Sequence, residues 1–121
     1  MTSKGDVYLV NFPPGLEGEQ RGTRPALIIQ NDEGNQFSPT TIVAAMTSRQ
    51  TGYRFHVRVK AKDSGLDRDS TVMLEQVRTI AQSRLGRRIG RLPSDVMHEV
   101  DRALHFSLGL EGCPITRSSA L

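Results

Sequence analysis

EQRGTRPALIIQND, residues 19–32, is the segment around which the rest of this sequence can be ordered. It begins as a basic loop that contains a glycine, and the apolar run 26–29 that follows is typical of a strand buried on both faces. Pro25 has no backbone N–H to donate, so we place it at the first residue of this strand. Arg24 then lies where a loop meets a rigid strand. The local pattern by itself favours an ordinary surface arginine there over a charge with a function.

The flanking sequence predicts a mainly β fold with some α structure. Strands are predicted at 5–12, 25–30, 41–46, 55–62 and 71–80, and the Arg-rich stretch 86–92 is compatible with a short edge strand. In 55–62 apolar and polar side chains alternate, which indicates a half-buried strand with a cationic wet face. Glu75, Gln76 and Arg78 are embedded in an otherwise apolar strand, so they pair with one another or line a site.

One helix is predicted near the C-terminal end. Ser94 is the expected N-cap, Asp95 favours the first turn, and Gly109 suits the stop. The segments 31–40 and 63–70 are interpreted as polar turns. Four or five strands followed by one helix predict an antiparallel, partly closed barrel with the helix on one flank, since parallel crossovers would need helices between strands.

Length and composition indicate one domain, which we place at 1–110, and we expect no fixed structure in the tail 111–121. The chain has 121 residues, 36% of them hydrophobic and 24% charged, which is typical of a soluble globular protein. No apolar run approaches a membrane span, and the start has no signal peptide, so export is not expected. The single cysteine, Cys113, excludes an internal disulfide framework and fits a reducing cytoplasm.

The basic residues are unevenly placed although the formal net charge is only +3. The stretches 49–62 and 78–91 each carry five Lys or Arg residues and no acid. Together on one face they could hold a polyanion, and a solvated polar face explains them equally well. No phosphate loop, HExxH or GxSxG motif is present, and neither histidines nor carboxylates cluster as metal ligands do. An enzyme with this sequence is expected to work without metal or cofactor.

A positive charge beside a hydroxyl is the remaining candidate chemistry. Arg24 opens one buried strand and Thr47 follows another, so antiparallel pairing would bring both side chains to one rim of the sheet. A guanidinium fork binds two phosphate oxygens and a threonine hydroxyl reaches a third. Such a pair can stabilise the charge that grows during phosphodiester transfer. RNA supplies its own nucleophile in the 2′-hydroxyl.

The chain resembles the MazF/PemK toxins of bacterial toxin–antitoxin pairs, in segments that follow one another across about residues 4–110. These segments are GDVYLVNF, GTRPALIIQND, SPTTIVAAMTS, DRDSTVMLEQVRTI and VDRALHFSLGL. The resemblance implies an SH3-like barrel with a C-terminal helix, a homodimer, and a cognate MazE-like antitoxin whose acidic tail covers the RNA groove. It also implies a sequence-specific, ribosome-independent, metal-free endoribonuclease (an mRNA interferase). Such enzymes cut single-stranded RNA to 2′,3′-cyclic phosphate and 5′-hydroxyl ends, which stops translation and growth.

The resemblance implies that Arg24 and Thr47 are the catalytic residues. It replaces the interpretation of Arg24 as an ordinary surface arginine, which the local pattern favours. The residues expected to bind RNA are Glu19, Gln20, Asn31 and Gln76 from the family pattern, with Arg49 and His56 from the basic stretch. The segment 49–55 departs from the family pattern, and we expect it to tune which bases are accepted. Since a guanidinium is a poor base, the group that accepts the 2′-hydroxyl proton stays open between Glu19 and His56.

Two other functions are compatible with the same fold. One is a gyrase-poisoning toxin like CcdB, which would act through the end of the C-terminal helix. The other is a non-catalytic nucleic-acid-binding barrel that grips a backbone through a basic groove. Cleavage of a bare RNA separates both from the nuclease.

Overall fold

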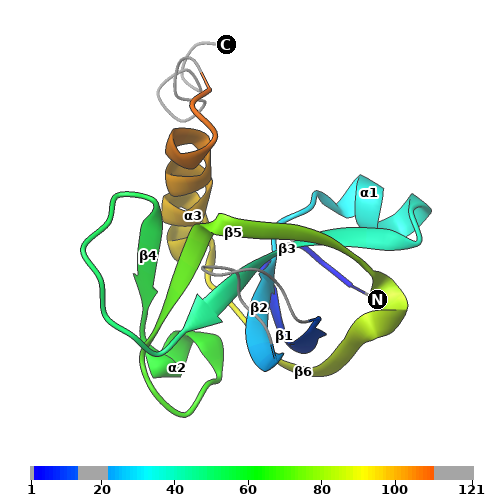
Figure 1. Ribbon diagram of the computed structural model, residues 1–121, viewed down its shortest axis with the longest axis horizontal. Coiled ribbons are helices and arrows are strands. Elements are labelled where there is room, and N and C mark those ends of the chain that lie inside the picture. The colour runs from blue at the N-terminus through cyan, green and yellow to red at the C-terminus, as the bar shows by residue number, and fades with distance from the viewer. Residues whose placement is uncertain (1, 14–21, 111–121) are drawn as a thin grey trace.

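The computed structural model describes residues 2–13 and 22–110 (Figure 1). Glu19, Gln20 and the tail 111–121 therefore lie outside the described residues. The strands are β1 (Asp6–Phe12), β2 (Gly22–Ile28), β3 (Thr40–Thr47), β4 (His56–Val59), β5 (Ser70–Ala81) and β6 (Leu85–Arg91). The helices are α1 (Asp32–Phe37), α2 (Ala61–Ser64) and α3 (Ser94–Ser107), with a 3₁₀ turn, η1, at Gln82–Arg84.

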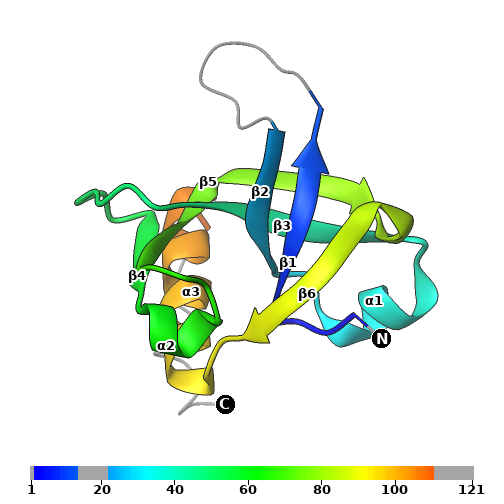
Figure 2. The same ribbon diagram turned by 90° about the horizontal axis from the view of Figure 1, so that it is seen from below.

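The described strands form one antiparallel sheet in the order β4-β5-β3-β2-β1-β6. The sheet bends strongly, so that β1, β2 and β6 run across β3 and β5 (Figure 2). It does not close, because β4 and β6 remain edge strands. The predicted antiparallel, partly closed fold with a C-terminal helix is confirmed. The predicted count of four or five strands and one helix is wrong, since six strands and two further short helices are present in the described part.

The core lies on both sides of β2. Leu27 and Ile29 belong to one buried cluster, which includes Val100 of α3, while Ala26 and Ile28 belong to a second cluster on the other face. Burial on both faces is thus confirmed for the run 26–29. β2 itself begins earlier than predicted, at Gly22, so its proline is not its first residue. Pairing with β3 begins only after that proline, which has no N–H to donate.

Two short helices occupy segments that were predicted as a turn and as strand. Asn31 caps α1, because its side chain accepts a hydrogen bond from Gly34 N at 2.7 Å. β4 ends at Val59 instead of continuing to residue 62. The chain then enters α2, where the Asp69 carboxylate accepts a hydrogen bond from Ala61 N at 2.9 Å. A contact between distant residues thus overrides the alternating pattern.

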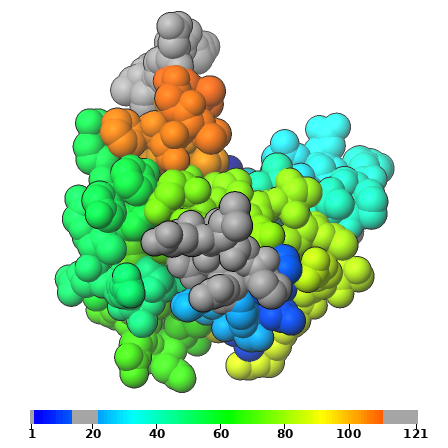
Figure 3. Space-filling view, in the orientation of Figure 1, coloured from blue at the N-terminus to red at the C-terminus, as the bar shows by residue number. Residues whose placement is uncertain are grey.

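α3 confirms the predicted C-terminal helix and corrects its N-cap. Pro93 occupies the cap position, Ser94 is already helical, and no side chain caps this end. At the other end Gly109 adopts a left-handed backbone, φ +67°, as its stop position requires. α3 stands out from the body of the molecule beside β4, and α1 lies on the opposite side (Figure 3). None of the described helices is long and apolar enough to cross a membrane.

A buried carboxylate joins the edge strand β6 to β1. The Asp6 side chain is only 2% exposed, and it accepts hydrogen bonds from Arg88 at 3.2 Å and from Arg91 at 3.1 Å. Its second oxygen accepts a bond from Ser3 N at 3.0 Å. These three bonds satisfy a charge that would otherwise be costly to bury.

Candidate active site

Arg24 and Thr47 are brought together by the pairing of β2 with β3. The last ladder pair before the strands diverge is Ala26 with Ala45, and continuing this register by two residues places Arg24 opposite Thr47. Because side chains alternate along a strand, both point to the face that Ala26 and Ala45 occupy. The fold therefore brings the guanidinium and the hydroxyl to one side of the sheet, and their joint role in catalysis stays a prediction.

Both side chains line one open pocket of about 430 Å³. Its lining comes from the ends of β2 and β3, from the loop between β3 and β4, and from the middle of β5. The described residues that line it are Arg24, Thr47, Ser48, Arg49, Thr51, Tyr53, His56, Met73, Glu75 and Gln76. These residues include two arginines and one carboxylate, so the lining has an excess of positive charge and the pocket suits an anion.

A wide bulge in β5 supplies one wall of this pocket. Between the pairs Ala44 with Val77 and Met46 with Val72, β3 advances two residues while β5 advances five. The extra residues include Glu75 and Gln76. Bulges bend a strand and re-aim its side chains. This is why the polar pair predicted to line a site within a buried strand leaves the core and reaches the pocket.

His56 connects the bulge to the loop that precedes β4. Its Nε2 lies 2.8 Å from Glu75 Oε1 and its Nδ1 lies 2.6 Å from Thr51 Oγ1. The imidazole is only 6% exposed, whereas the Glu75 side chain is 39% exposed. An ionised carboxylate can only accept, so Nε2 carries the proton, and the threonine hydroxyl donates to Nδ1 when the ring is neutral. The ring is therefore fixed at both nitrogens.

The start of the same loop is fixed by backbone contacts. Thr47 Oγ1 accepts a hydrogen bond from Arg49 N at 3.2 Å, and the Arg49 carbonyl accepts one from Thr71 Oγ1 at 2.8 Å. The lone pairs of the Thr47 hydroxyl are thus partly used within the loop. Its hydrogen remains available to a ligand oxygen in the pocket.

The pocket contains five of the eight residues predicted from the sequence: Arg24, Thr47, Arg49, His56 and Gln76. Asn31 caps α1 and is not among the lining residues, so a role in RNA binding stays a prediction there. Glu19 and Gln20 lie outside the described residues. Their proposed role also stays a prediction.

The sequence did not single out Thr51 or Tyr53, because a short polar loop carries no periodic signal. Arg78 was noticed only as a polar residue in β5. One of its terminal nitrogens, Nη1, is buried without a hydrogen-bond partner, and the guanidinium lies 5.4 Å from the centre of the Phe12 ring. With Glu75 and Gln76 it lines a smaller adjoining hollow of about 310 Å³.

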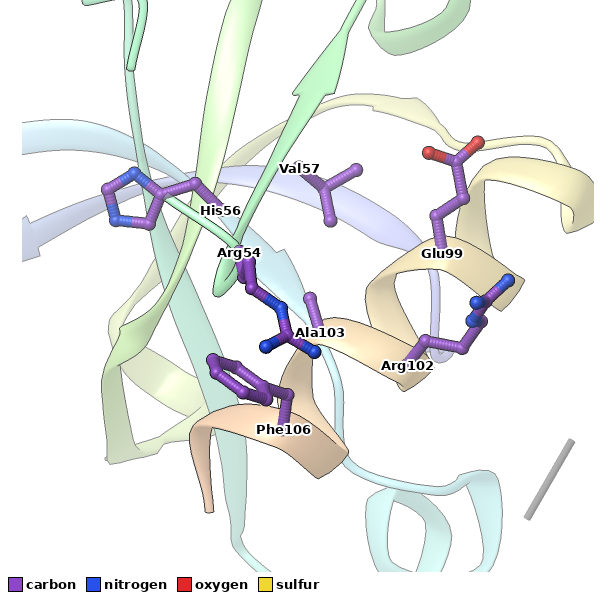
Figure 4. A pocket seen from close by; sticks show the side chains of 7 residues that line it. All are labelled: Arg54, His56, Val57, Glu99, Arg102, Ala103 and Phe106. Atoms are coloured by element: carbon purple, nitrogen blue, oxygen red, sulfur yellow. The ribbon is translucent and has the colours of Figure 1, made fainter. Parts of the chain in front are cut away.

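A second pocket, of about 540 Å³, lies between β4 and α3 (Figure 4). There the Arg54 guanidinium lies over the Phe106 ring, 4.0 Å from its centre. The His56 ring points away from this pair (Figure 4), and His56 lines both pockets. The catalytic pair predicted from the sequence lines the first pocket and not this one.

The comparisons by sequence and by structure find the same kind of protein. Endoribonuclease EndoA of Bacillus subtilis (strain 168) is 46% identical over 112 residues, covering 91% of this chain and 97% of that protein. Solved structures include a MazE–MazF complex from Deinococcus radiodurans, 29% identical with a TM-score of 0.72, covering 91% of this chain and 97% of that one. An endoribonuclease in complex with its cognate antitoxin, from a Mycobacterial species, has the same fold, with a TM-score of 0.79 at 21% identity. It covers 93% of this chain and 99% of that one.

The family model that matches spans nearly the whole described chain. It covers residues 3–108 and describes PemK-like, MazF-like toxins of type II toxin–antitoxin systems. Together with the 46% identity to a protein of nearly the same length, this match assigns the family. The chain belongs to the PemK-like, MazF-like toxins of type II toxin–antitoxin systems.

Proposed function

We propose that this chain, a MazF-like endoribonuclease of a toxin–antitoxin pair, cleaves single-stranded RNA in the pocket that Arg24 and Thr47 share. The observation that supports the proposal is that Arg24 of β2 and Thr47 of the neighbouring strand β3 line one pocket. The 46% identity to an endoribonuclease supports the same reaction class. The open, cationic shape of the pocket suits a nucleic acid backbone.

The proposed reaction is an internal transfer at one phosphodiester. The ribose 2′-oxygen attacks phosphorus, the 5′-oxygen of the next nucleotide leaves, and a 2′,3′-cyclic phosphate and a 5′-hydroxyl form. One proton leaves the 2′-hydroxyl and one is delivered to the departing 5′-oxygen. Arg24 holds the phosphate oxygens and stabilises their growing charge, and the Thr47 hydroxyl donates to one of them. Since the nucleophile belongs to the RNA, we propose that no metal ion takes part.

We assign the proton acceptor to Glu75. It is the one carboxylate among the described residues that line the pocket, and only its Oε1 is bonded to His56. The second carboxylate oxygen is available to the 2′-hydroxyl. Both nitrogens of His56 are already engaged, so the imidazole is better suited to orient Glu75 than to accept the proton itself. The proton acceptor assigned here is neither of the two residues considered from the sequence, because the contact between the bulge in β5 and His56 could not be predicted from the sequence.

The biological partners follow from the family. We propose that the chain forms a homodimer and is inhibited by a cognate MazE-like antitoxin. A solved MazE–MazF complex from Deinococcus radiodurans supports the pairing with an antitoxin. We place it in the cytoplasm, where mRNA and a co-expressed antitoxin are found. We also propose that residues 1–110 form the whole catalytic domain, supported by the family match to residues 3–108.

The experiment is cleavage of a long RNA by purified protein, in EDTA, mapped by primer extension. We expect discrete cuts, a cyclic phosphate at each 3′ end, and loss of cleavage in Arg24→Ala and Thr47→Ala proteins that keep the wild-type circular dichroism spectrum. The exposed Arg87 of β6, which does not line the pocket, provides the matched control Arg87→Ala.

Two results would contradict the proposal. Intact RNA, together with salt-dependent binding, would instead support a passive nucleic-acid-binding barrel. Intact RNA together with inhibition of gyrase supercoiling would support the gyrase-poison alternative.

A further inference from the structure

Tyr53 is an aromatic residue that is exposed and yet held in place. Its ring stacks on Phe55, with ring centres 5.0 Å apart and planes 9° from parallel. The residue is nevertheless 61% exposed. Burial therefore cannot account for the ring's position, and its face opposite Phe55 is left without a described aromatic neighbour. An exposed ring with one face supported is what a stacking platform needs.

His56 supports both aromatic rings from the side. Its imidazole meets Tyr53 edge-on at 5.2 Å and Phe55 edge-on at 4.9 Å. The imidazole is itself fixed by the Thr51 hydroxyl and the Glu75 carboxylate. The orientation of the Tyr53 ring is thus coupled to the carboxylate that we assign as proton acceptor.

The loop that carries Tyr53 is anchored at both ends. On one side Arg49 is held by bonds to Thr47 and Thr71. On the other, the guanidinium of Arg54 lies over the Phe106 ring of α3 (Figure 4). A side chain on a loop held in this way loses little conformational entropy when a ligand binds, so its contacts contribute more fully to affinity.

The position of Tyr53 indicates which part of a ligand it would meet. Tyr53 lines the same pocket as Arg24 and Thr47, whereas Phe55 behind it does not. A phosphate held by the guanidinium and the hydroxyl would therefore have its adjoining nucleotides in or next to the pocket that the ring lines. A nucleobase is the flat, weakly hydrated group that such a face binds, and stacking accepts any base.

We propose that Tyr53 is the platform of a base subsite, on which a nucleobase next to the scissile phosphate stacks. The inference rests on the proposed function, since it takes the RNA cleaved at Arg24 and Thr47 as its ligand. Tyr53 acts here on binding and on the orientation of the ribose, and it takes no part in proton transfer. The subsite gives the loop a role in binding and positioning the RNA, and it does not by itself select one base over another.

The test combines an abasic scan with substitutions at Tyr53. A short RNA containing a mapped cleavage site is synthesised with an abasic ribose at each position from two nucleotides before the scissile phosphate to two after it. Each RNA is cut by wild-type protein, Tyr53→Ala and Tyr53→Phe. Phe37→Ala is the matched control, because Phe37 is 76% exposed on α1, on the opposite side of the molecule (Figures 1 and 3).

One abasic position is expected to reduce kcat/KM of the wild-type enzyme by about fivefold to about a hundredfold, as loss of one stacked base does. Tyr53→Ala should lose the same factor on intact RNA, mainly in KM, and should be indifferent to the abasic site at that one position. Tyr53→Phe and Phe37→Ala should both behave as the wild type does. A merely structural role for Tyr53 would instead lower cleavage of intact and abasic RNA equally.

Two outcomes overturn the inference, and they differ from failure of the proposed function. The first is a Tyr53→Ala enzyme with wild-type kcat/KM. The second is one whose defect is the same for every abasic position. In both cases the wild-type enzyme still cuts RNA, so only the subsite is lost. Absence of cleavage by the wild-type enzyme removes the proposed function itself.

Discussion

Arg24→Lys separates two roles that a positive charge can play in this pocket. The substitution keeps the charge and removes the planar fork, so it tests whether Arg24 binds two phosphate oxygens at once or acts as a point charge. Arg24 is exposed, at the end of the strand segment where β2 no longer pairs with β3. We therefore expect the free energy of unfolding to change by no more than about 0.5 kcal/mol.

The expected loss of activity follows from the geometry. In the pocket that it shares with Thr47, the guanidinium of Arg24 is proposed to donate to two oxygens of one phosphate, and an ammonium would retain one of those bonds. A hydrogen bond to a charged group is worth about 1.5–3 kcal/mol, so kcat/KM should fall by about 10-fold to about 150-fold. If the lost bond strengthens in the transition state, the decrease appears in kcat with KM nearly constant.

The assay is cleavage of a short RNA with a fluorophore and a quencher at its ends, with kcat and KM measured separately. Arg87→Lys, an exposed arginine outside the pocket, is the control and should leave both constants unchanged. Wild-type kcat/KM in the Arg24→Lys enzyme would refute the bidentate role. If kcat/KM falls only to the extent that the Arg24→Lys protein is unfolded in the assay buffer, the loss is one of stability, and the expected unchanged stability is refuted.

Three further substitutions test the site and the fold. Glu75→Gln keeps an acceptor for His56 and removes the proposed base, so kcat should fall by about 10²- to 10⁴-fold while the thermal midpoint stays constant. If the variant remains fully active, another group accepts the 2′-hydroxyl proton. Asp6→Ala should lower the free energy of unfolding by about 1–3 kcal/mol in urea, less than for a fully buried pair because the two arginines of β6 that it binds are half exposed. Gly65→Ala should cost about 1–3 kcal/mol in the same urea titration, because its φ is +84° and a Cβ would lie 2.8 Å from the Ile89 carbonyl oxygen; an unchanged midpoint would show that the turn adapts.

Much of the architecture was predictable because it rests on local patterns. The apolar run 26–29, the strands around it and the amphipathic α3 are each specified by their own side chains, and all of them are present. The errors occurred where single hydrogen bonds decide. Ala61 N donates to the Asp69 carboxylate eight residues away, and strand-like sequence ends there in α2. Gly34 N donates to the side chain of Asn31, only three residues away, and this cap begins α1 in a segment interpreted as a turn. Such contacts leave no periodic trace in the sequence.

The candidate site also has one part that the sequence predicts and another that it does not. Arg24 and Thr47 could be paired from the sequence because each adjoins a buried strand, and antiparallel neighbours bring such ends together. The local pattern of Arg24 favoured an ordinary surface arginine, and the family resemblance was what assigned both residues a catalytic role. The partners of His56 could not be named, since the bulge in β5 that delivers Glu75 to it arises where the register between β5 and β3 shifts, while β4 pairs with the other edge of β5.

The sequence by itself determined the chemical groups of this protein and the strands that carry them, because burial and alternation act over a few neighbouring residues. Tertiary structure alone decided that Glu75 meets His56 and that the exposed ring of Tyr53 lines the same pocket as Arg24 and Thr47. Those relations depend on strand register and on a bulge. Both are set by packing across the whole sheet, which no single segment encodes.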